Sequence, residues 1–349
     1  MKRKFSIPIV SIVIVGVVLS LVGMTLVSQA ASVEKIQNSH RQAPEPIPAT
    51  DVKIVKKTFL PPEIGKVKGK PATPPGKDKN NGPAATGILG DTTTGTKYAI
   101  VIGICDYPGT DHDICWSDGD SLNMYNALTN LYGYTSDNIY LFRDTIPNHL
   151  DITDGPATFA NIKVAVDEIR VKVNSGTGGD EVVFFFSGHG ADGIAQDSDK
   201  ETRDEGIVVH NGTNLVVIWD GQLREWFSDF NTTRIVFVFD SCLAGGMNDV
   251  AVDGRVVNMA TEETQVAYVY SKGEPGVKEG EGVFSHYFVN EGMLQARADQ
   301  YDHDKDGVKP EGNDVVVEEA FDYADGIIPS IWEKQNPVIS DKFTNDLLF

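Results

Sequence analysis

The sequence predicts a three-layer α/β/α sandwich with a mostly parallel central sheet. Two short, continuously apolar runs, residues 182–186 and 235–239, are typical of parallel strands that helices cover on both faces. Segments with helical spacing of apolar residues alternate with such runs along the chain. Each of the two runs leads into a reactive side chain, so the functional site is expected at the carboxyl edge of the sheet.

The expected elements begin near residue 96. A first strand is predicted at residues 98–104, a helix at 121–131 and a short strand at 138–142. Thr158 is the expected N-cap of a helix with apolar residues at Ile162, Val166 and Ile169. A helix at 221–230 is expected between the two apolar runs. After the second run come strands at 256–260 and 266–270 and helices at 284–294 and 315–332.

Charge is divided unevenly along the chain. Residues 1–90 carry 13 Lys/Arg and 5 Asp/Glu, a net charge of +8. Residues 91–349 carry 17 and 45, a net charge of −28, and the two parts sum to the −20 of the whole chain. An acidic domain of this kind repels nucleic acid and favours cationic partners and bound cations. The composition therefore argues against nucleic-acid binding.

Residues 1–30 are expected to be a signal peptide or an N-terminal membrane anchor. A basic start, Lys2 to Lys4, precedes an apolar stretch at about residues 5–27, and Ser28 and Ala30 provide the small residues of a cleavage site. Because the apolar stretch is nearly long enough to span a bilayer, a tether through residues 5–27 stays open. Either alternative predicts a protein that is secreted or held on the extracellular face of the membrane.

Residues 31–95 are rich in Pro, Gly, Thr and Lys and poor in aromatic residues. Such a segment is expected to be a disordered linker or pro-segment, which leaves residues 96–349 as the folded domain. The chain has three cysteines, Cys105, Cys115 and Cys242. An odd number leaves at least one free thiol in an exported chain.

His189 follows the first apolar run and Cys242 follows the second. If the two strands are neighbours, an imidazole and a thiol stand side by side, which is the arrangement of a Cys–His dyad for nucleophilic catalysis. A lone cysteine at a strand end is usually a small buried hydrophobe, so the prediction depends on the pair. The N–H groups of Gly190 and Cys242 are candidates for stabilising an oxyanion.

These blocks resemble the caspase-like cysteine peptidases of the caspase/gingipain/legumain clan, in particular the metacaspase-type enzymes. The matching residues are 186–190 around His189 and 240–242 around Cys242, and the separation of 242 − 189 = 53 residues is similar to that in caspases. Residues 114–120 look like the Cys-x-x-Asp element of the family. The resemblance covers about residues 96–349. After the cysteine, Leu243-Ala244-Gly245 departs from the frequent His-Ser-Gly, which leaves the subfamily open.

The resemblance implies a specificity pocket for a basic residue, built from Cys115, Asp118, Ser187 and Asp240. Asp120 is an alternative to Asp118 because the Asp-Gly-Asp spacing leaves the register ambiguous. Two carboxylates in a shielded pocket favour an ammonium or guanidinium group, and arginine can bind them with forked hydrogen bonds.

Residues 301–319 contain a calcium-loop-like insertion. Asp302, Asp304 and Asp306, followed by Gly307, form the front half of a calcium loop. Residue 313 is Asn where a standard loop has Glu, so the Val308 carbonyl and Glu318 or Glu319 are the expected further ligands. A second acidic group follows the histidine: Asp192, Asp197, Asp199, Asp204 and Glu205. The resemblance implies calcium in this region, with Asp204, Glu205 and Asp220 favoured.

The leading hypothesis is an exported, calcium-assisted cysteine endopeptidase that cuts protein or peptide substrates after Arg or Lys. Calcium is not required for the dyad chemistry itself. Self-processing is expected at Lys272, Lys278 or the lysines of the 53–79 segment. Two alternatives stay open: a catalytically silent calcium-binding surface protein with a caspase fold, and a dyad peptidase with legumain-like Asn specificity.

Overall fold

The computed structural model describes residues 45–61, 82–109, 111–114, 116–145, 152–197, 201–271 and 281–349. All of these belong to one compact unit, residues 43–349. The expected export segment, Cys115, Lys272 and Lys278 lie outside the described residues. Every helix within the described ranges is too short or too polar to cross a membrane.

A six-stranded sheet forms the centre of the molecule, in the order β13-β10-β9-β5-β3-β4. Five strands are parallel, and β13 pairs antiparallel with β10 at one edge. The two apolar runs of the sequence are neighbouring strands in its middle, as expected. The bounds are β3 (Lys97–Ile104), β4 (Ile139–Asp144), β5 (Glu181–Ser187), β9 (Arg234–Asp240), β10 (Arg255–Met259) and β13 (Val338–Asp341).

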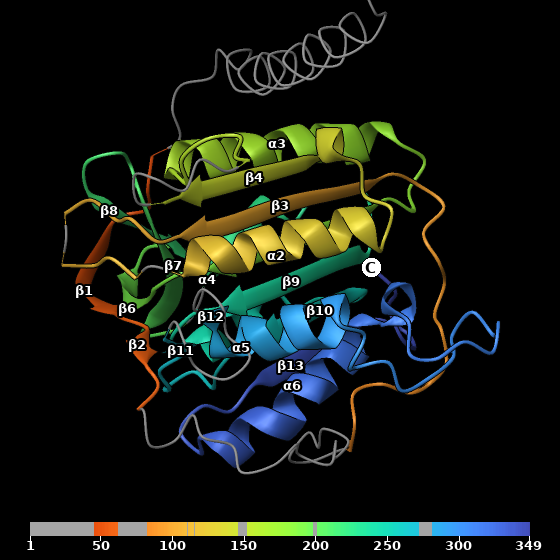
Figure 1. The fold of residues 1–349 in the computed structure, drawn as a ribbon. Helices are drawn as coiled ribbons and strands as arrows, with labels where there is room; N and C mark the ends of the chain where they lie inside the picture. Colours follow the sequence, from red (N-terminus) through yellow and green to blue (C-terminus); the bar gives the residue numbers. More distant parts are fainter. Residues whose placement is uncertain are drawn as a thin grey trace, which may run out of the picture. The chain divides into compact units, whose positions relative to one another are not determined.

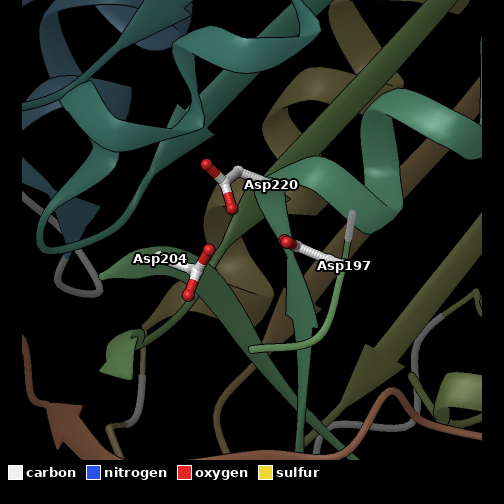
Figure 2. A group of neighbouring side chains, drawn as sticks. All are labelled: Asp197, Asp204 and Asp220. Carbon is white, nitrogen blue, oxygen red and sulfur yellow. The ribbon is translucent and has the colours of Figure 1, made fainter. Parts of the chain in front are cut away.

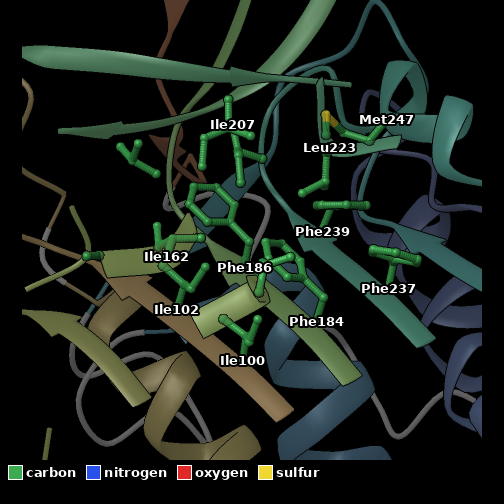
Figure 3. Close-up of a cluster of buried hydrophobic side chains, with 14 of the residues drawn as sticks. Ile100, Ile102, Ile162, Phe184, Phe186, Ile207, Leu223, Phe237, Phe239 and Met247 are labelled. Carbon is green, nitrogen blue, oxygen red and sulfur yellow. The ribbon is translucent and has the colours of Figure 1, made fainter. Parts of the chain in front are cut away.

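Helices cover both faces of this sheet. On one face, Phe184 and Phe237 pack in a cluster with Ile162 and Leu223, which belong to α3 (Phe159–Ser175) and α4 (Asp220–Trp226) (Figure 3). The other face packs against α2 (Ser117–Asn130), α6 (Val317–Ile331) and α5 (Val283–Ser285), which continues as a π-helix, η3 (His286–Leu294) (Figure 1). Because each fully buried aliphatic or Phe side chain contributes about 1.5–3 kcal/mol, these two cores supply most of the stability. The three-layer α/β/α sandwich is confirmed.

Two smaller sheets lie beyond the carboxyl ends of the parallel strands, where the arrowheads of β3, β4 and β9 point (Figure 1). One is antiparallel, in the order β1-β6-β7-β8, and the other has the order β12-β11-β2. The bounds are β1 (Ala49–Val55), β6 (Gly190–Ala195), β7 (Asp204–His210), β8 (Leu215–Trp219), β2 (Thr58–Phe59), β11 (Tyr268–Tyr270) and β12 (Glu281–Gly282). Three short 3₁₀ segments complete the elements: η1 (Ser136–Asn138), η2 (Ala244–Val250) and η4 (Gly312–Asp314).

Strands β1 and β2 fall within the segment that was expected to be a linker. Residues 52, 54, 55 and 58 are Val, Ile, Val and Thr, which favour strands once a partner edge is available. Strand β6 provides that edge for β1, and β11 provides it for β2. We call residues 55–59, where β1 passes into β2, the strap.

Candidate active site

His189 and Cys242 lie at the same edge of the central sheet. Strands β5 and β9 pair in parallel with Ser187 opposite Asp240, so each reactive residue follows its strand end by two positions. The N–H of Gly188 donates to the carbonyl of Asp240 at 3.2 Å. A Cβ atom at Gly190 would lie 2.0 Å from the carbonyl oxygen of Cys242. Glycine at this position therefore lets the histidine segment lie directly against the cysteine.

The imidazole of His189 is held on three sides. Its Nε2 lies 2.8 Å from the carbonyl oxygen of His112, and its Nδ1 accepts the backbone N–H of Lys57 at 3.1 Å. The ring stacks on Tyr107, with centroids 5.0 Å apart. These partners assign the neutral tautomer, in which Nε2 carries the proton. Burial lowers the pKa of His189 to about 4, so the ring is neutral at physiological pH.

The thiol of Cys242 is also enclosed. Its Sγ accepts the N–H of Ala267 at 3.3 Å, and burial raises the pKa of Cys242 to about 12. A cysteine nucleophile must be a thiolate. With the thiol protonated and the imidazole neutral, the pair is chemically quiet in this arrangement.

The strap covers both groups, and His189 and Cys242 are each only 1% exposed. On one side, Val55 of the strap pairs with Gly190. On the other side, the N–H of Thr58 donates to the carbonyl of Ala267 at 3.3 Å. The two reactive residues lie at one edge of the central sheet, as expected, but the strap covers this edge.

Between these two anchor points, the side chain of Lys57 enters an acidic site. Its Nζ lies 2.7 Å from Oδ1 of Asp240, 3.0 Å from Oγ of Ser187 and 4.0 Å from Oδ2 of Asp120. The side chains of Lys57, Asp120 and Asp240 are fully buried. Burial raises the pKa of Asp120 to about 8, against the lowering effect of the Lys57 ammonium. We call Asp120, Ser187 and Asp240 the lysine site.

Asp120, not Asp118, belongs to the lysine site. The carboxylate of Asp118 lies 3.6 Å from the guanidinium of Arg143, and its backbone carbonyl accepts Nε of the same arginine at 2.9 Å. Helix α2 begins at Ser117, four residues before the expected start, so both acids are helical. Two residues along a helix turn through roughly 200°, which directs the two side chains to different neighbours. Ser187 and Asp240 lie where the resemblance implied, whereas Cys115 is outside the described residues.

Sequence reasoning missed three residues of this site: Lys57, Gly282 and Ser285. The N–H of Gly282 donates to Asp120, and both the N–H and the hydroxyl of Ser285 donate to Asp240. No motif marks these positions. Lys57 is one of the lysines of the 53–79 segment that were expected as self-processing sites, but no pattern singled it out among them.

The acidic group that follows the histidine forms a candidate calcium site. Carboxylate oxygens of Asp197, Asp204 and Asp220 lie within 4.8 Å of one another, and the three side chains point toward a common centre (Figure 2). All three residues are buried. Hard carboxylate oxygens are the ligands that calcium prefers, and burying like charges together is costly without a cation. The donor set therefore fits calcium.

Two further acids of this region, Glu201 and Glu205, form an overlapping group with Asp220. Burial, followed by the charge of Glu263, raises the pKa of Glu205 to about 7. Asp192 instead forms an ion pair with Arg203, and Asp199 lies outside the described residues. Of the residues favoured from the sequence, Asp204, Glu205 and Asp220 are all brought to this place.

The structure gathers only part of the predicted calcium loop. Oxygens of Asp302, Asp304 and Asp306 lie within 4.8 Å of one another, and Asp304 also groups with Glu311 and Asp314. The predicted ligands Glu318 and Glu319 are not in either group. Glu318 accepts the N–H of Leu347 at 2.9 Å, and Glu319 accepts that of Gln300 at 2.7 Å. Both glutamates lie in the first turn of α6 and are buried, so their side chains bind backbone instead. Val308 is exposed, and its N–H donates to Asp306 at 2.7 Å.

Comparison with known proteins agrees with this geometry. Residues 97–251, which include both His189 and Cys242, match the family model described as metacaspase, peptidase C14 domain. This region is similar to the metacaspase-type, caspase-like domains. The family is one of cysteine-type endopeptidases. Strands β3 to β9 of the central sheet, together with the histidine and cysteine segments, lie inside the matched region.

Among similar proteins, metacaspase-4 of Arabidopsis thaliana is 32% identical over 158 residues, which cover 45% of this chain and 35% of the relative. Metacaspase-8 of the same organism is 32% identical over 155 residues, with 43% and 38% covered. Metacaspase-1 of Saccharomyces cerevisiae (strain YJM789) is 29% identical over 160 residues, with 45% and 35% covered. The chain thus spans little more than a third of the length of these relatives.

Proposed function

We propose that the protein is a cysteine endopeptidase that cuts after a basic residue. The observation that carries this proposal is Lys57 itself, whose ammonium lies 2.7 Å from one buried acidic side chain and 4.0 Å from another. These acids lie at the sheet edge that also carries His189 and Cys242. A basic side chain of a substrate would be held in the same way when the strap is displaced. This position would bring the neighbouring peptide bond to Cys242.

The residues supply each step of acyl transfer. With the strap displaced, His189 takes the proton of the Cys242 thiol, and the thiolate attacks the carbonyl carbon of the basic residue. The N–H groups of Gly190 and Cys242 stabilise the oxyanion. His189 then gives the proton to the leaving amine, and water hydrolyses the thioester to release the acid and restore the thiol. The carbonyl of His112 fixes the ring orientation through Nε2.

We infer that the strap keeps the enzyme latent and that Lys57 is bound as a blocking residue. Cleavage after Lys57 would need the imidazole beside the leaving nitrogen, which is that of Thr58. Instead, His189 contacts the N–H of Lys57 itself, and the N–H of Thr58 donates to Ala267. The contact therefore lies one residue from the bond to be cut. Self-processing is proposed for Lys272, Lys278 or the other lysines of the 53–79 segment.

Calcium assistance is proposed at the site of Asp197, Asp204 and Asp220. Arg203, which precedes one of these acids, donates to Asp51 of β1 at 2.9 Å and pairs with Asp192 of β6. The strand that leads into the strap is therefore fastened by a neighbour of the calcium site. A cation there would neutralise the three carboxylates and order the segment that carries Arg203.

Export is proposed on the basis of the first 30 residues, with their basic start, apolar stretch and small residues at 28 and 30. Whether residues 5–27 are cleaved or tether the protein is decided by the mass of the protein recovered from its producing cells. Nearly all of the acidic charge lies after residue 90, and it favours cationic protein segments as substrates.

A peptide panel tests the proposed function. Fluorogenic peptides that differ only in Lys, Arg, Asn or Asp before the scissile bond are incubated with the full chain and with Lys57→Ala, each with and without calcium. We expect cleavage of the basic peptides, its loss in Cys242→Ala, and covalent labelling of Cys242 by an Arg-bearing acyloxymethyl ketone. Cleavage of the Asn peptide alone would establish the legumain-like alternative. Binding of calcium without cleavage or labelling would establish the silent surface protein.

A further inference from the structure

The two carboxylates of the lysine site differ in what they offer to a bound cation. At Asp240, Oδ2 accepts both the N–H of Ser285 at 3.1 Å and the hydroxyl of Ser285 at 2.6 Å. Only Oδ1 is left for the ligand, and it lies 2.7 Å from Nζ of Lys57. Ser285 therefore turns a potentially two-pronged carboxylate into a single acceptor.

Asp120 is committed to neighbouring groups on both of its oxygens. The N–H of Gly282 is shared between Oδ1 and Oδ2 at 3.1 and 3.2 Å, and the hydroxyl of Ser187 donates to Oδ2 at 2.6 Å. The Lys57 ammonium lies 4.0 Å away, beyond hydrogen-bond distance. Asp120 thus faces the ammonium across 4.0 Å without forming a direct hydrogen bond to it.

The space around these carboxylates is tight. A Cβ atom at Gly282 would lie 2.1 Å from Oδ2 of Asp240 and 2.9 Å from Oδ2 of Asp120. The Lys57 side chain that fills the site is fully buried. Neither carboxylate can therefore move toward Gly282 to make room for a longer and wider side chain.

These features suit an ammonium better than a guanidinium. An ammonium is a compact point charge, for which one carboxylate oxygen and the hydroxyl of Ser187 at 3.0 Å are good partners. A guanidinium is longer, planar and forked, and its advantage comes from two parallel hydrogen bonds to one carboxylate. Here the second oxygen of Asp240 is already taken.

We propose that the lysine site selects substrates with Lys over substrates with Arg, and that Ser285 is the positioning residue that sets this preference. The proposal rests on the proposed function and narrows its substrate class. It differs from the expectation drawn from the sequence, in which two carboxylates favoured both cations and the arginine fork.

The preference is measured in the full chain carrying Lys57→Ala, which empties the site. Two peptides identical except for Lys or Arg before the scissile bond are compared by kcat/KM. We expect the Lys peptide to be preferred by roughly tenfold or more, since one charge-assisted hydrogen bond contributes about that factor. Adding Ser285→Ala removes the hydroxyl and leaves only the backbone N–H of residue 285 on Oδ2, so that Oδ2 can accept a second hydrogen bond from a guanidinium. This change should lower the Lys-to-Arg ratio roughly tenfold, chiefly through a lower KM for the Arg peptide.

Two serine variants serve as controls. Ser285→Thr keeps the hydroxyl and should restore the ratio. Ser330→Ala removes a helix hydroxyl that donates to Ile327, away from the site, and should leave the ratio unchanged. A separate measurement does not depend on any change at Ser285. In the otherwise unchanged chain, Lys57→Arg should raise the basal activity on the Lys peptide, because an arginine blocks the site less well.

Each outcome bears on one claim. An Arg peptide cut as well as the Lys peptide, or a Lys57→Arg chain as silent as the parent, would overturn the preference while leaving the peptidase in place. A ratio that Ser285→Ala does not change would overturn the role of Ser285. Absence of cleavage of both peptides, with no labelling of Cys242, would instead refute the proposed function.

Discussion

The ammonium of Lys57 lies 2.7 Å from a carboxylate oxygen of Asp240, and both side chains are entirely buried. The two residues are far apart in sequence: Lys57 precedes the region that matches the metacaspase model, and Asp240 ends strand β9 within it. A buried ion pair of this kind is sensitive to the loss of either partner, because the other charge is left without compensation.

Replacing Lys57 with Ala should activate the enzyme and weaken the fold together. We expect the initial rate on a Lys peptide to rise at least about tenfold, because the strap competes at a high effective concentration. We also expect a loss of about 3–5 kcal/mol in the free energy of unfolding, since the carboxylates stay buried. Lys53→Ala is the matched control, because Lys53 is exposed. Equal rates for the two variants would contradict the blocking role.

Thiol labelling reports the state of Cys242. Since burial raises its pKa to about 12, the reactive thiolate is scarce at pH 7 and grows as pH rises toward that value. Alkylation by iodoacetamide should therefore increase about tenfold per pH unit between pH 7 and 10 in the parent chain. In Lys57→Ala it should be faster at pH 7 and depend less on pH. Cys105, which is also buried, gives the internal comparison by peptide mass mapping. Rapid labelling of the parent at neutral pH would refute the enclosed state.

Asp118 and Asp120 form a matched pair on helix α2. Asp120→Asn should raise the KM of a basic peptide roughly tenfold, because an amide cannot become the second anion that faces the bound cation. Asp118→Asn should leave that KM unchanged and lower the free energy of unfolding by about 1–3 kcal/mol, since it faces Arg143. The measurements are steady-state kinetics in the Lys57→Ala background and denaturant unfolding. If Asp118→Asn raised the KM and Asp120→Asn did not, Asp118 would be the acid that binds the substrate in the active form.

Calcium binding should depend on the buried site. We expect calcium at about 100 times its dissociation constant to stabilise the parent chain by about 2.7 kcal/mol. This stabilisation should be lost in Asp204→Asn and Asp220→Asn but kept in Asp302→Asn, which changes the exposed loop. Calorimetric titration and thermal unfolding check it without reference to activity. Loss only in Asp302→Asn would move the site to the loop at residues 302–306.

Two glycines of the domain should respond oppositely to alanine. Gly190→Ala would force a methyl group to within 2.0 Å of the Cys242 carbonyl oxygen, so we expect a loss of about 1–3 kcal/mol and of activity. Gly119 lies in α2, with nothing within 4 Å of a Cβ placed there. Gly119→Ala should therefore stabilise the chain by about 0.5–1 kcal/mol. Chemical denaturation measures both, and a stable, active Gly190→Ala would mean that the two strand ends separate easily.

The central sheet could be predicted because its strands are marked by their own residues. Residues 182–186 and 235–239 are apolar without interruption, which is typical of strands covered on both faces. The predicted N-cap Thr158 accepts the N–H of Asn161 at 3.1 Å, as local rules require. The small sheets lack such marks. Strand β6, Gly-Ala-Asp-Gly-Ile-Ala, has neither alternation nor β-branched density and exists because β1 and β7 flank it.

The residues of the candidate site that lie at strand ends could be predicted from the sequence. His189, Ser187, Asp240 and Cys242 follow directly from the parallel register of β5 and β9. Lys57 and Ser285 could not be predicted, because each reaches the site from a segment whose placement depends on tertiary pairing. The same is true of Glu318 and Glu319, whose nearness to the acidic loop in sequence gave no sign that their carboxylates bind backbone inside the fold.

The strap is held at both ends by strand pairing, because β1 pairs with β6 and β2 pairs with β11. Strand β1 is the outermost strand of one small sheet, and β2 is the outermost strand of the other. When they withdraw, β6 and β11 become open borders with unpaired backbone groups, one on each side of the reactive pair. A polypeptide that arrives extended can then add to those borders through its own main chain. The affinity for a substrate would then come from the length of its extended backbone. The single side chain that enters the lysine site would determine only where the substrate is cut.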